Sequence, residues 1–452
     1  MRDPATRQIA FINLAHVFTH YCLLILATAV LFVPLQAPAA FGTEYGPILA
    51  LGTGMFVLYG LGSLPMGWLA ARFGRKALMA AFFLGTGSAM AAVGLASSPL
   101  ALGAALALMG AFAAIYHPIG TAMLVEAAGE RVGRSVGVNG VFGNLGVASA
   151  PVVSAFLAAQ AGWRWAFLLP GALCVLAGLA YLREPAFDAA KAGGAQRPFP
   201  AIPPAVVRRA VLVLMAIAAV SGLVFNAFTL LLPKLMQERL ASSPDLLPVV
   251  GLLAFLTTLC GGLTQFTVGR LIDRHRLRRV FLPLALALVP CLLLLAFADG
   301  VAVLPLAAVV AASVFGQVTV NETMTARYVA PALRAKLYSV RFTVGFLGAA
   351  AASPLVGLLH ERTGGLSLPL LVLAALAIGR EAITLRLIAA GAQVQAFPDD
   401  VLAAAFAESR KLYTEYAEGN ENFRRIYEHW SAYWQKQQQW LRVAELPYDY
   451  FT

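Results

Sequence analysis

Long apolar segments separated by short polar loops recur along almost the whole chain. A segment of about 20 apolar residues is long enough to cross the hydrocarbon core of a bilayer as a helix, which satisfies its own backbone hydrogen bonds there. The pattern predicts twelve such spans, the last of them irregular. They cover residues 9–34, 47–70, 77–95, 101–125, 136–158, 165–181, 211–232, 246–268, 280–297, 301–324, 340–359 and 366–388.

The composition supports an all-α integral membrane protein. Hydrophobic residues make up 60% of the 452-residue chain and charged residues 12%. A water-soluble globule of this composition would have more apolar surface than it could bury. The four cysteines, Cys22, Cys174, Cys260 and Cys291, lie in apolar segments without metal-ligand spacing, and we interpret them as small core residues.

Lysine and arginine lie mainly in one set of loops. If the N-terminus is cytoplasmic, the predicted outer loops hold only Arg164, Lys234, Arg239 and Arg362. The positive-inside rule therefore predicts a multi-pass protein of the bacterial inner membrane with both termini in the cytoplasm. The net charge of +11 reflects this topology and suits contact with the headgroups of the lipid bilayer. We therefore predict no nucleic-acid partner.

Two changes in composition divide the chain. One is a segment rich in Pro, Ala and Gly that separates six spans from six, and the other comes near Gly379, where Arg380 and Glu381 interrupt the apolar run of the twelfth span. We therefore expect an irregular twelfth helix. The predicted organisation is an N-terminal six-helix bundle at 1–182, a cytoplasmic linker at 183–209, a C-terminal six-helix bundle at 210–390 and an amphipathic helical tail at 391–452.

A short basic loop occurs twice, at residues 67–76 and 269–278. Positions that match 202 residues apart include Gly67 with Gly269, Arg72 with Arg274, Lys76 with Arg278, Arg134 with Lys336, Asn139 with Arg341 and Gly143 with Gly345. Pro151 matches Pro354 at a separation of 203. The repeat indicates that a whole six-helix half is duplicated in parallel, as in transporters whose substrate binds between two halves.

The repeated loop resembles the signature of the major facilitator superfamily, and the resemblance covers residues 1 to about 378. It implies two six-helix bundles that rock around a central site. The acid of the family's signature is replaced by Ala71 in the first copy and kept as Asp273 in the second, while the signature's second glycine is kept as Gly74 and replaced by Arg276.

The loop residues are candidates for gating, because an acid can bond a neighbouring helix end and hold one side of a transporter closed. We expect Glu126 to lie near Arg72, Arg131 and Arg134. The alternative is that the cations only set topology. The gating candidates are Gly67, Arg72, Arg75, Lys76, Glu126, Gly269, Asp273, Arg274 and Arg278.

The glycine-rich segment 133–151 resembles the fifth helix of antiporters in this superfamily, although tight helix packing explains the glycines nearly as well. The stretches 116–120 and 139–146 resemble a bacterial branch near the fosmidomycin-resistance transporters. Both resemblances imply a secondary transporter.

Polar side chains inside apolar spans are expensive and tend to face a cavity. Asn13, His16 and His20 share one helical face. In this superfamily the first, fourth, seventh and tenth helices line the cavity. The candidates for substrate binding or coupling are Asn13, His16, His20, Tyr116, His117, Asn144, Asn226, Gln317, Asn321, Glu322 and Arg341.

Each ionisable candidate also has a plainer interpretation. A histidine could carry a coupling proton or serve as an interhelical hydrogen-bond partner. Glu322 could protonate during transport or pair with Arg327 or Arg341. Arg341 could attract an anionic solute or extend to the cytoplasmic headgroups.

The tail differs from the body in its charge and its aromatic content. Its apolar positions follow two helical stripes, one from Leu402 to Tyr416 and one from Phe423 to Trp434. The tail contains Phe397-Pro-Asp-Asp-Val-Leu, Tyr413, Asn422-Phe-Arg-Arg-Ile-Tyr-Glu and Trp440-Leu-Arg-Val-Ala-Glu. Through these runs the segment from about Glu381 to Thr452 resembles the C-terminal end of TRAP-type solute-binding proteins, which favours a fusion tail. The alternative is a pair of amphipathic helices on the bilayer or on the cytoplasmic face.

The sequence predicts a monomeric secondary transporter that moves a small organic solute or drug by alternating access, coupled to protons. It has no G-x-x-x-x-G-K-[ST] loop for ATP and no His-Glu-x-x-His pattern for zinc, so we predict no enzyme activity, no cofactor and no metal. The alternatives are a transporter-like solute sensor that signals through its tail, and an inactive fusion product.

Overall fold

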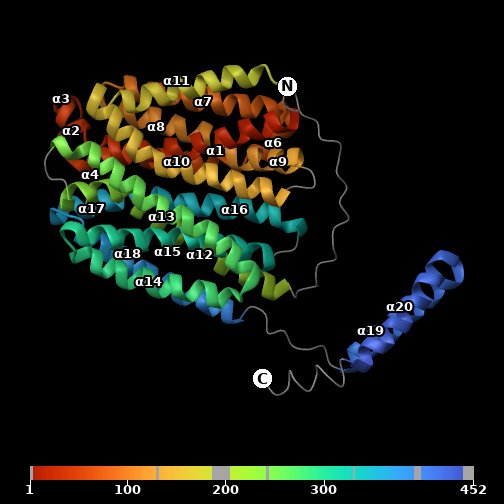
Figure 1. Cartoon of the computed structure of the whole chain (residues 1–452). Coiled ribbons are helices and arrows are strands. Elements are labelled where there is room, and N and C mark those ends of the chain that lie inside the picture. The colour runs from red at the N-terminus through yellow and green to blue at the C-terminus, as the bar shows by residue number, and fades with distance from the viewer. Residues whose placement is uncertain are drawn as a thin grey trace. The chain divides into compact units, whose positions relative to one another are not determined.

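A computed structural model describes residues 4–128, 132–185, 204–240, 244–328, 331–390 and 399–440. The described chain is helical and separates into two compact units, Met1–Gly391 and Ala392–Thr452. In the first unit the helices run side by side, with the red-to-yellow first half packed along the green-to-blue second half (Figure 1). Twelve helical segments are long and apolar enough to cross a membrane, which confirms the predicted number of spans.

The described part of the first half holds eleven helices, of which α2, α3 and α6 lie outside its six candidate spans. They are α1 (Pro4–Ala29), α2 (Val33–Gln36), α3 (Pro38–Phe41), α4 (Tyr45–Ala50), α5 (Thr53–Gly62), α6 (Met66–Phe73), α7 (Arg75–Leu95), α8 (Pro99–Ala113), α9 (Tyr116–Ala128), α10 (Val132–Ala161) and α11 (Trp165–Leu182).

The described part of the second half forms its six candidate spans from seven α-helices. They are α12 (Pro204–Leu240), α13 (Leu247–Arg274), α14 (Leu277–Phe297), α15 (Val303–Tyr328), α16 (Pro331–Ala350), α17 (Ala352–Thr363) and α18 (Ser367–Ala390), with one-turn 3₁₀ helices at Pro244–Leu246 and Gly300–Ala302.

Proline explains where some spans are broken. Its ring removes a backbone donor and crowds the carbonyl four residues earlier. The break between α8 and α9 lies four and three residues before Pro118, and the break between α16 and α17 lies three residues before Pro354. Tyr116 and His117 therefore begin a new helix.

Glycine contacts show the duplication in three dimensions. A Cβ added at Gly146 of α10 would lie 2.3 Å from the carbonyl oxygen of Val17 on α1. A Cβ added at Gly348 of α16 would lie 2.1 Å from the carbonyl oxygen of Ala219 on α12. Gly348 lies 202 residues after Gly146, and Ala219 lies 202 residues after Val17. The two halves therefore pack their first and fifth spans in the same register.

The predicted irregularity of the twelfth span is wrong for the backbone, because α18 runs unbroken through Arg380 and Glu381. Both side chains are buried and pair with each other, and Nε of Arg380 donates to Oε1 of Glu381 at 3.1 Å. The hydroxyl of Thr384 also donates to the carbonyl of Arg380 at 2.8 Å. Opposite charges that neutralise each other can remain within an apolar helix without ending it.

The second unit contains α19 (Asp399–Gly419) and α20 (Glu421–Trp440), so the predicted helical tail is confirmed as helical. Asn420 is the N-cap of α20, and its side-chain oxygen accepts a hydrogen bond from the backbone N–H of Phe423 at 3.0 Å. The ring of Tyr413 lies 5.5 Å from that of Tyr427 and 6.2 Å from that of Trp430. The two predicted aromatic stripes therefore contact each other, although the side chains of Leu402 and Phe406 lie outside the described residues.

Candidate functional site

Asn139 of α10 joins three helices of the first half through its side chain. Its Nδ2 donates to Oδ1 of Asn13 on α1 at 2.9 Å and lies 2.9 Å from the hydroxyl of Tyr116 on α9. Asn13 and Asn139 are each 6% exposed and Tyr116 is fully buried. Buried polar groups are stable when they are hydrogen-bonded to one another, so these three side chains fix the relative positions of α1, α9 and α10.

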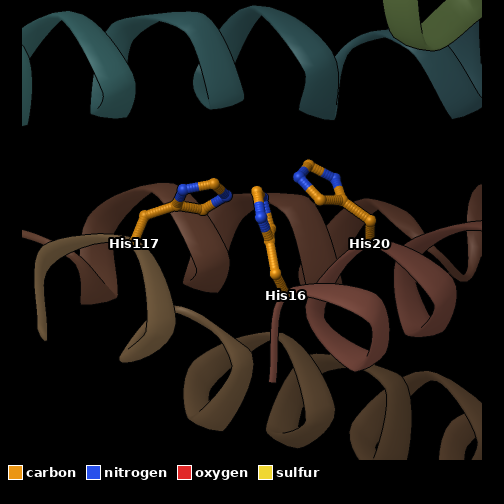
Figure 2. A group of neighbouring side chains, drawn as sticks. All are labelled: His16, His20 and His117. Carbon is orange, nitrogen blue, oxygen red and sulfur yellow. The ribbon is translucent and has the colours of Figure 1, made fainter. Parts of the chain in front are cut away.

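The three predicted histidines lie together directly beside this network. His16, His20 and His117 each place a ring nitrogen within 4.8 Å of the others. The ring of His16 lies 4.9 Å from that of His20 and 5.4 Å from that of His117, and it stacks on Tyr116 at 4.8 Å. Figure 2 shows all three rings pointing in the same direction, away from their own helices and toward the teal ribbon of the second half.

The orientation of His16 is set by a backbone group. Its Nδ1 lies 2.7 Å from the carbonyl oxygen of Asn139. A carbonyl can only accept a hydrogen bond, so Nδ1 donates and the lone pair of a neutral ring is on Nε2. A Cβ at residue 143 would lie 2.6 Å from this Nε2, so glycine at that position leaves the space that the ring occupies.

The second half covers the histidines with aromatic rings. Phe342 of α16 lies 4.6 Å from the ring of His117, and Phe346, one turn later, lies 4.4 Å from the ring of Tyr59 on α5. The hydroxyl of Tyr59 lies 3.0 Å from that of Thr19 on α1. The histidine cluster therefore lies where the two halves meet, as a solute site between rocking bundles requires.

The remaining binding candidates do not join this cluster in the contacts that the described residues make. Asn144 packs against Gly262 of α13, and Asn226 donates to its own helix at the carbonyl of Gly222, at 2.9 Å. Asn321 lies 3.5 Å from the hydroxyl of Ser221, which joins α15 to α12. Gln317 is buried, and its Nε2 has no hydrogen-bond partner among the described residues. Arg341 is partly buried within α16, and the side chain of Glu322 lies outside the described residues.

At the α6–α9 end of the bundle, one gating candidate has a partner that we did not predict. Glu126 pairs with Arg75 at the start of α7. The guanidinium of Arg72 instead lies 5.7 Å from the ring of Trp68 and 5.5 Å from that of Phe73. The loop orientation that turns Arg72 toward these exposed rings leaves Arg75 next to α9.

The other loop candidates form few described contacts. Lys76 donates to the carbonyl of Leu182 at 3.2 Å, while Arg274 and Arg278 are exposed. A Cβ at Gly67 would meet no described atom within 4 Å, and one at Gly269 would meet only Thr319, at 4.0 Å. The side chains of Arg131, Arg134 and Asp273 lie outside the described residues, so the predicted charge lock stays a prediction.

A polar contact at the opposite end, where α4 meets α17, was not predicted. The backbone N–H of Gly46 on α4 donates to Oε1 of Glu361 on α17 at 2.7 Å, which joins the two halves. His360 lies next to it, with Nε2 2.6 Å from Oε1 of Glu238 on α12, and Lys234 lies 3.5 Å from the same oxygen. The spacing of Glu238 and His360 in the sequence gave no signal, because the residues meet only through tertiary packing.

Asn139 was also missed as a site residue. It entered the sequence comparison only as the residue that matches Arg341 in the second half. Two polar residues at matching positions of both halves, each within an apolar span, were a usable signal for a functional pair.

The duplicated helical bundle with a polar cluster between its halves defines a membrane transporter fold. The family profile described as Major Facilitator Superfamily matches residues 17–248 and 235–391. The chain belongs to this superfamily, which makes it a transporter rather than an enzyme. A comparison with curated protein sequences found no match.

Solved structures share the fold at low sequence identity. A bacterial homologue of the human lysosomal transporter Spinster, in an inward-facing and occupied conformation, aligns with a TM-score of 0.65 at 15% identity over 86% of this chain and 96% of that one. The same homologue in an inward-facing and unoccupied conformation gives 0.61 at 14% identity, with the same coverage of both chains. A mutant of the nucleoside transporter NupG gives 0.66 at 14% identity over 83% of this chain and 99% of that one.

Proposed function

We propose that this protein is a secondary active transporter that moves a small organic solute or drug across the bacterial inner membrane by alternating access. The observation that carries the proposal is the polar cluster of Asn13, His16, His20, His117 and Asn139 at the meeting of the two halves. Polar groups at this depth are costly unless they serve a binding site or a transport pathway.

Contacts at the two ends of the bundle support alternating access. At the α4–α17 end, a Cβ at Gly46 would lie 2.7 Å from the carbonyl of Gly357, and one at Gly251 would lie 2.7 Å from the carbonyl of Pro151. Toward the α6–α9 end, a Cβ at Gly137 or Gly140 of α10 would meet no described atom within 4 Å. The halves are therefore packed closely at one end, while these two glycines of α10 have no close neighbour among the described residues toward the other end.

We assign the α6–α9 end to the cytoplasm by the positive-inside rule, since Arg72, Arg75, Arg274 and Arg278 lie in its loops. With this orientation we propose an inward-facing arrangement with both termini in the cytoplasm. We propose that the solute binds to the histidine cluster from the first half and to polar groups on α12 and α15 from the second.

We propose protons as the coupling ion and a monomer as the working unit. The sequence lacks the phosphate-binding loop of an ATP-driven pump, so an ion gradient is the available energy source.

Transport can be tested with the purified full chain in proteoliposomes. A first screen measures thermal stabilisation by a panel of sugars, nucleosides, organic acids and cationic drugs, since a bound solute stabilises the folded state. Radiolabelled hits are then followed for uptake with an imposed pH gradient, with a membrane potential alone, and with neither. We expect accumulation that depends on the pH gradient. Accumulation that follows only the potential would reject proton coupling, and the absence of saturable movement in every condition would reject the transporter.

One observation favours a second candidate, a solute sensor that signals through its tail. The hairpin of α19 and α20 forms a compact unit of its own, outside the residues that match the superfamily. Its sequence resemblance to the end of a TRAP-type solute-binding protein remains a prediction, as does its origin as a fusion tail. Removal of residues 392–452 distinguishes the two functions, because a transporter retains uptake without the tail whereas a sensor loses its output.

A further inference from the structure

Three histidines from two helices converge on one point, and no carboxylate bonds to any of them among the described residues. His16 and His20 are one helical turn apart on α1, and His117 is the second residue of α9. In a cluster that only filled space, apolar rings would serve better, since each imidazole has two nitrogens that are costly to bury without a partner. Nε2 of His117 is such an atom, because it is buried and has no hydrogen-bond partner among the described residues.

The three ring nitrogens lie near one another, at separations somewhat longer than those around one metal ion. Zinc is bound by histidine nitrogens at about 2.0–2.1 Å, so three nitrogens around one ion lie about 3.3–3.5 Å apart. The ring nitrogens of this cluster lie within 4.8 Å of one another. Binding of one ion therefore requires the rings to turn toward one another about their Cα–Cβ and Cβ–Cγ bonds until these separations shorten.

The environment of His16 has the arrangement expected of a metal ligand. The imidazole of a metal-binding histidine commonly donates its other N–H to a backbone carbonyl or a carboxylate, which fixes the tautomer and makes the ligating nitrogen more basic. Nδ1 of His16 donates to the carbonyl of Asn139 in this way, at 2.7 Å. The hydrogen bonds from Asn139 to Asn13 and Tyr116 then hold the helix that carries this carbonyl.

We infer that His16, His20 and His117 bind one divalent transition-metal ion, of the class that prefers imidazole nitrogen, such as Zn²⁺, Co²⁺ or Ni²⁺. Three protein ligands leave a fourth position of a tetrahedral ion open. The ion keeps its full charge because the imidazoles are neutral, so the fourth position favours an anionic oxygen or a polarised water. Binding of the ion does not depend on which solute is carried or on whether the chain transports it.

The test is direct metal binding to the purified full chain in detergent, prepared with an affinity tag that contains no histidine. We expect Co²⁺ to bind at about one ion per chain with the intense visible bands of a tetrahedral site, and Zn²⁺ to displace it. The variants H16Q, H20Q and H117Q are each expected to weaken Co²⁺ binding at least tenfold, and the triple variant to abolish the bands.

Two matched controls separate this site from other histidines. His275 is exposed at the end of α13, and His360 lies beside the carboxylates of Glu238 and Glu361. The variants H275Q and H360Q should bind Co²⁺ as the wild type does. Glutamine keeps a polar side chain of similar length, and equal unfolding temperatures without metal would show that the triad variants are folded.

A second measurement uses stability. Zn²⁺ should raise the unfolding temperature of the wild type and leave that of the folded triple variant unchanged. The inference is overturned if the wild type shows neither stoichiometric Co²⁺ binding nor stabilisation by Zn²⁺, or if the triple variant binds Co²⁺ like the wild type. These outcomes leave the transport assay unaffected, so failure of the metal site and failure of the proposed function are distinguishable.

Discussion

Two buried asparagines of this protein form different kinds of hydrogen bond. Asn139 joins three helices through Asn13 and Tyr116, whereas among the described residues Asn226 donates only to the carbonyl of its own helix at Gly222. Both are less than a tenth exposed. A hydrogen bond between helices in a membrane contributes up to about 1.7 kcal/mol, while a bond within one helix adds little to tertiary stability. The comparison therefore isolates the value of the interhelical network.

We predict that N139A lowers the free energy of unfolding by about 1–2 kcal/mol, because it leaves the side-chain oxygen of Asn13 and the hydroxyl of Tyr116 without this partner. N226A should cost less than about half of that. Unfolding in mixed detergent micelles, followed by tryptophan fluorescence, measures both variants under one condition. Equal losses in the two variants would show that the network between α1, α9 and α10 has no special weight.

At the level of single side chains, sequence reasoning reached part of the site. The helical spacing of Asn13, His16 and His20 correctly predicted a shared face, because rotation along a helix is a local property. The approach of His117 to that face and the central position of Asn139 depend on how α9 and α10 pack on α1, which no local pattern encodes. The pairing of Glu126 with Arg75 was not predicted, for the same reason.

The spans show which helical properties the sequence determines. Their number, their order and the register of the repeat follow from apolar length and from the 202-residue correspondence, since both depend on position along the chain. The continuity of α18 was missed because Arg380 and Glu381 were counted as separate polar interruptions. As neighbours that bond to each other, they present less charge to the apolar surroundings than two isolated ions would.

The glycines of α10 provide a prediction within one helix. A Cβ at Gly146 would lie 2.3 Å from the carbonyl of Val17, whereas a Cβ at Gly140 would meet no described atom within 4 Å. We predict that G146A destabilises the protein by about 1–3 kcal/mol, as overpacking does. G140A should be neutral or stabilising by up to about 1 kcal/mol, because alanine favours the helix. Thermal unfolding of the two variants checks this, and a destabilisation of G140A equal to that of G146A would contradict it.

The two halves of the molecule are joined at the α4–α17 end by a hydrogen bond to Glu361, whose carboxylate also lies 3.6 Å from Nδ1 of His360 in the second half. The backbone N–H of Gly46 belongs to the first half, and the carboxylate of Glu361 that accepts its hydrogen bond belongs to the second. Glu238, close by, bonds to His360 and Lys234 and so stays within the second half. Loss of the Gly46–Glu361 bond should change the balance between the transporter's conformations, whereas loss of the bonds of Glu238 should not.

We predict that E361A shifts the protein toward a state that is open at the α4–α17 end. A hydrogen bond to a charged acceptor is worth about 1.5–3 kcal/mol, so its loss changes a two-state ratio by roughly tenfold or more. Spin labels at Glu44 and Arg362 report this end, and labels at Arg72 and Arg274 report the other, in a variant without the four native cysteines. Double electron–electron resonance should show a longer distance at the first pair of E361A together with a shorter one at the second. E238A is the control and should keep the wild-type distances. If both distances in E361A match those of E238A, this bond does not hold the two halves together, and the close packing of Gly46 on Gly357 is then sufficient to keep the end closed.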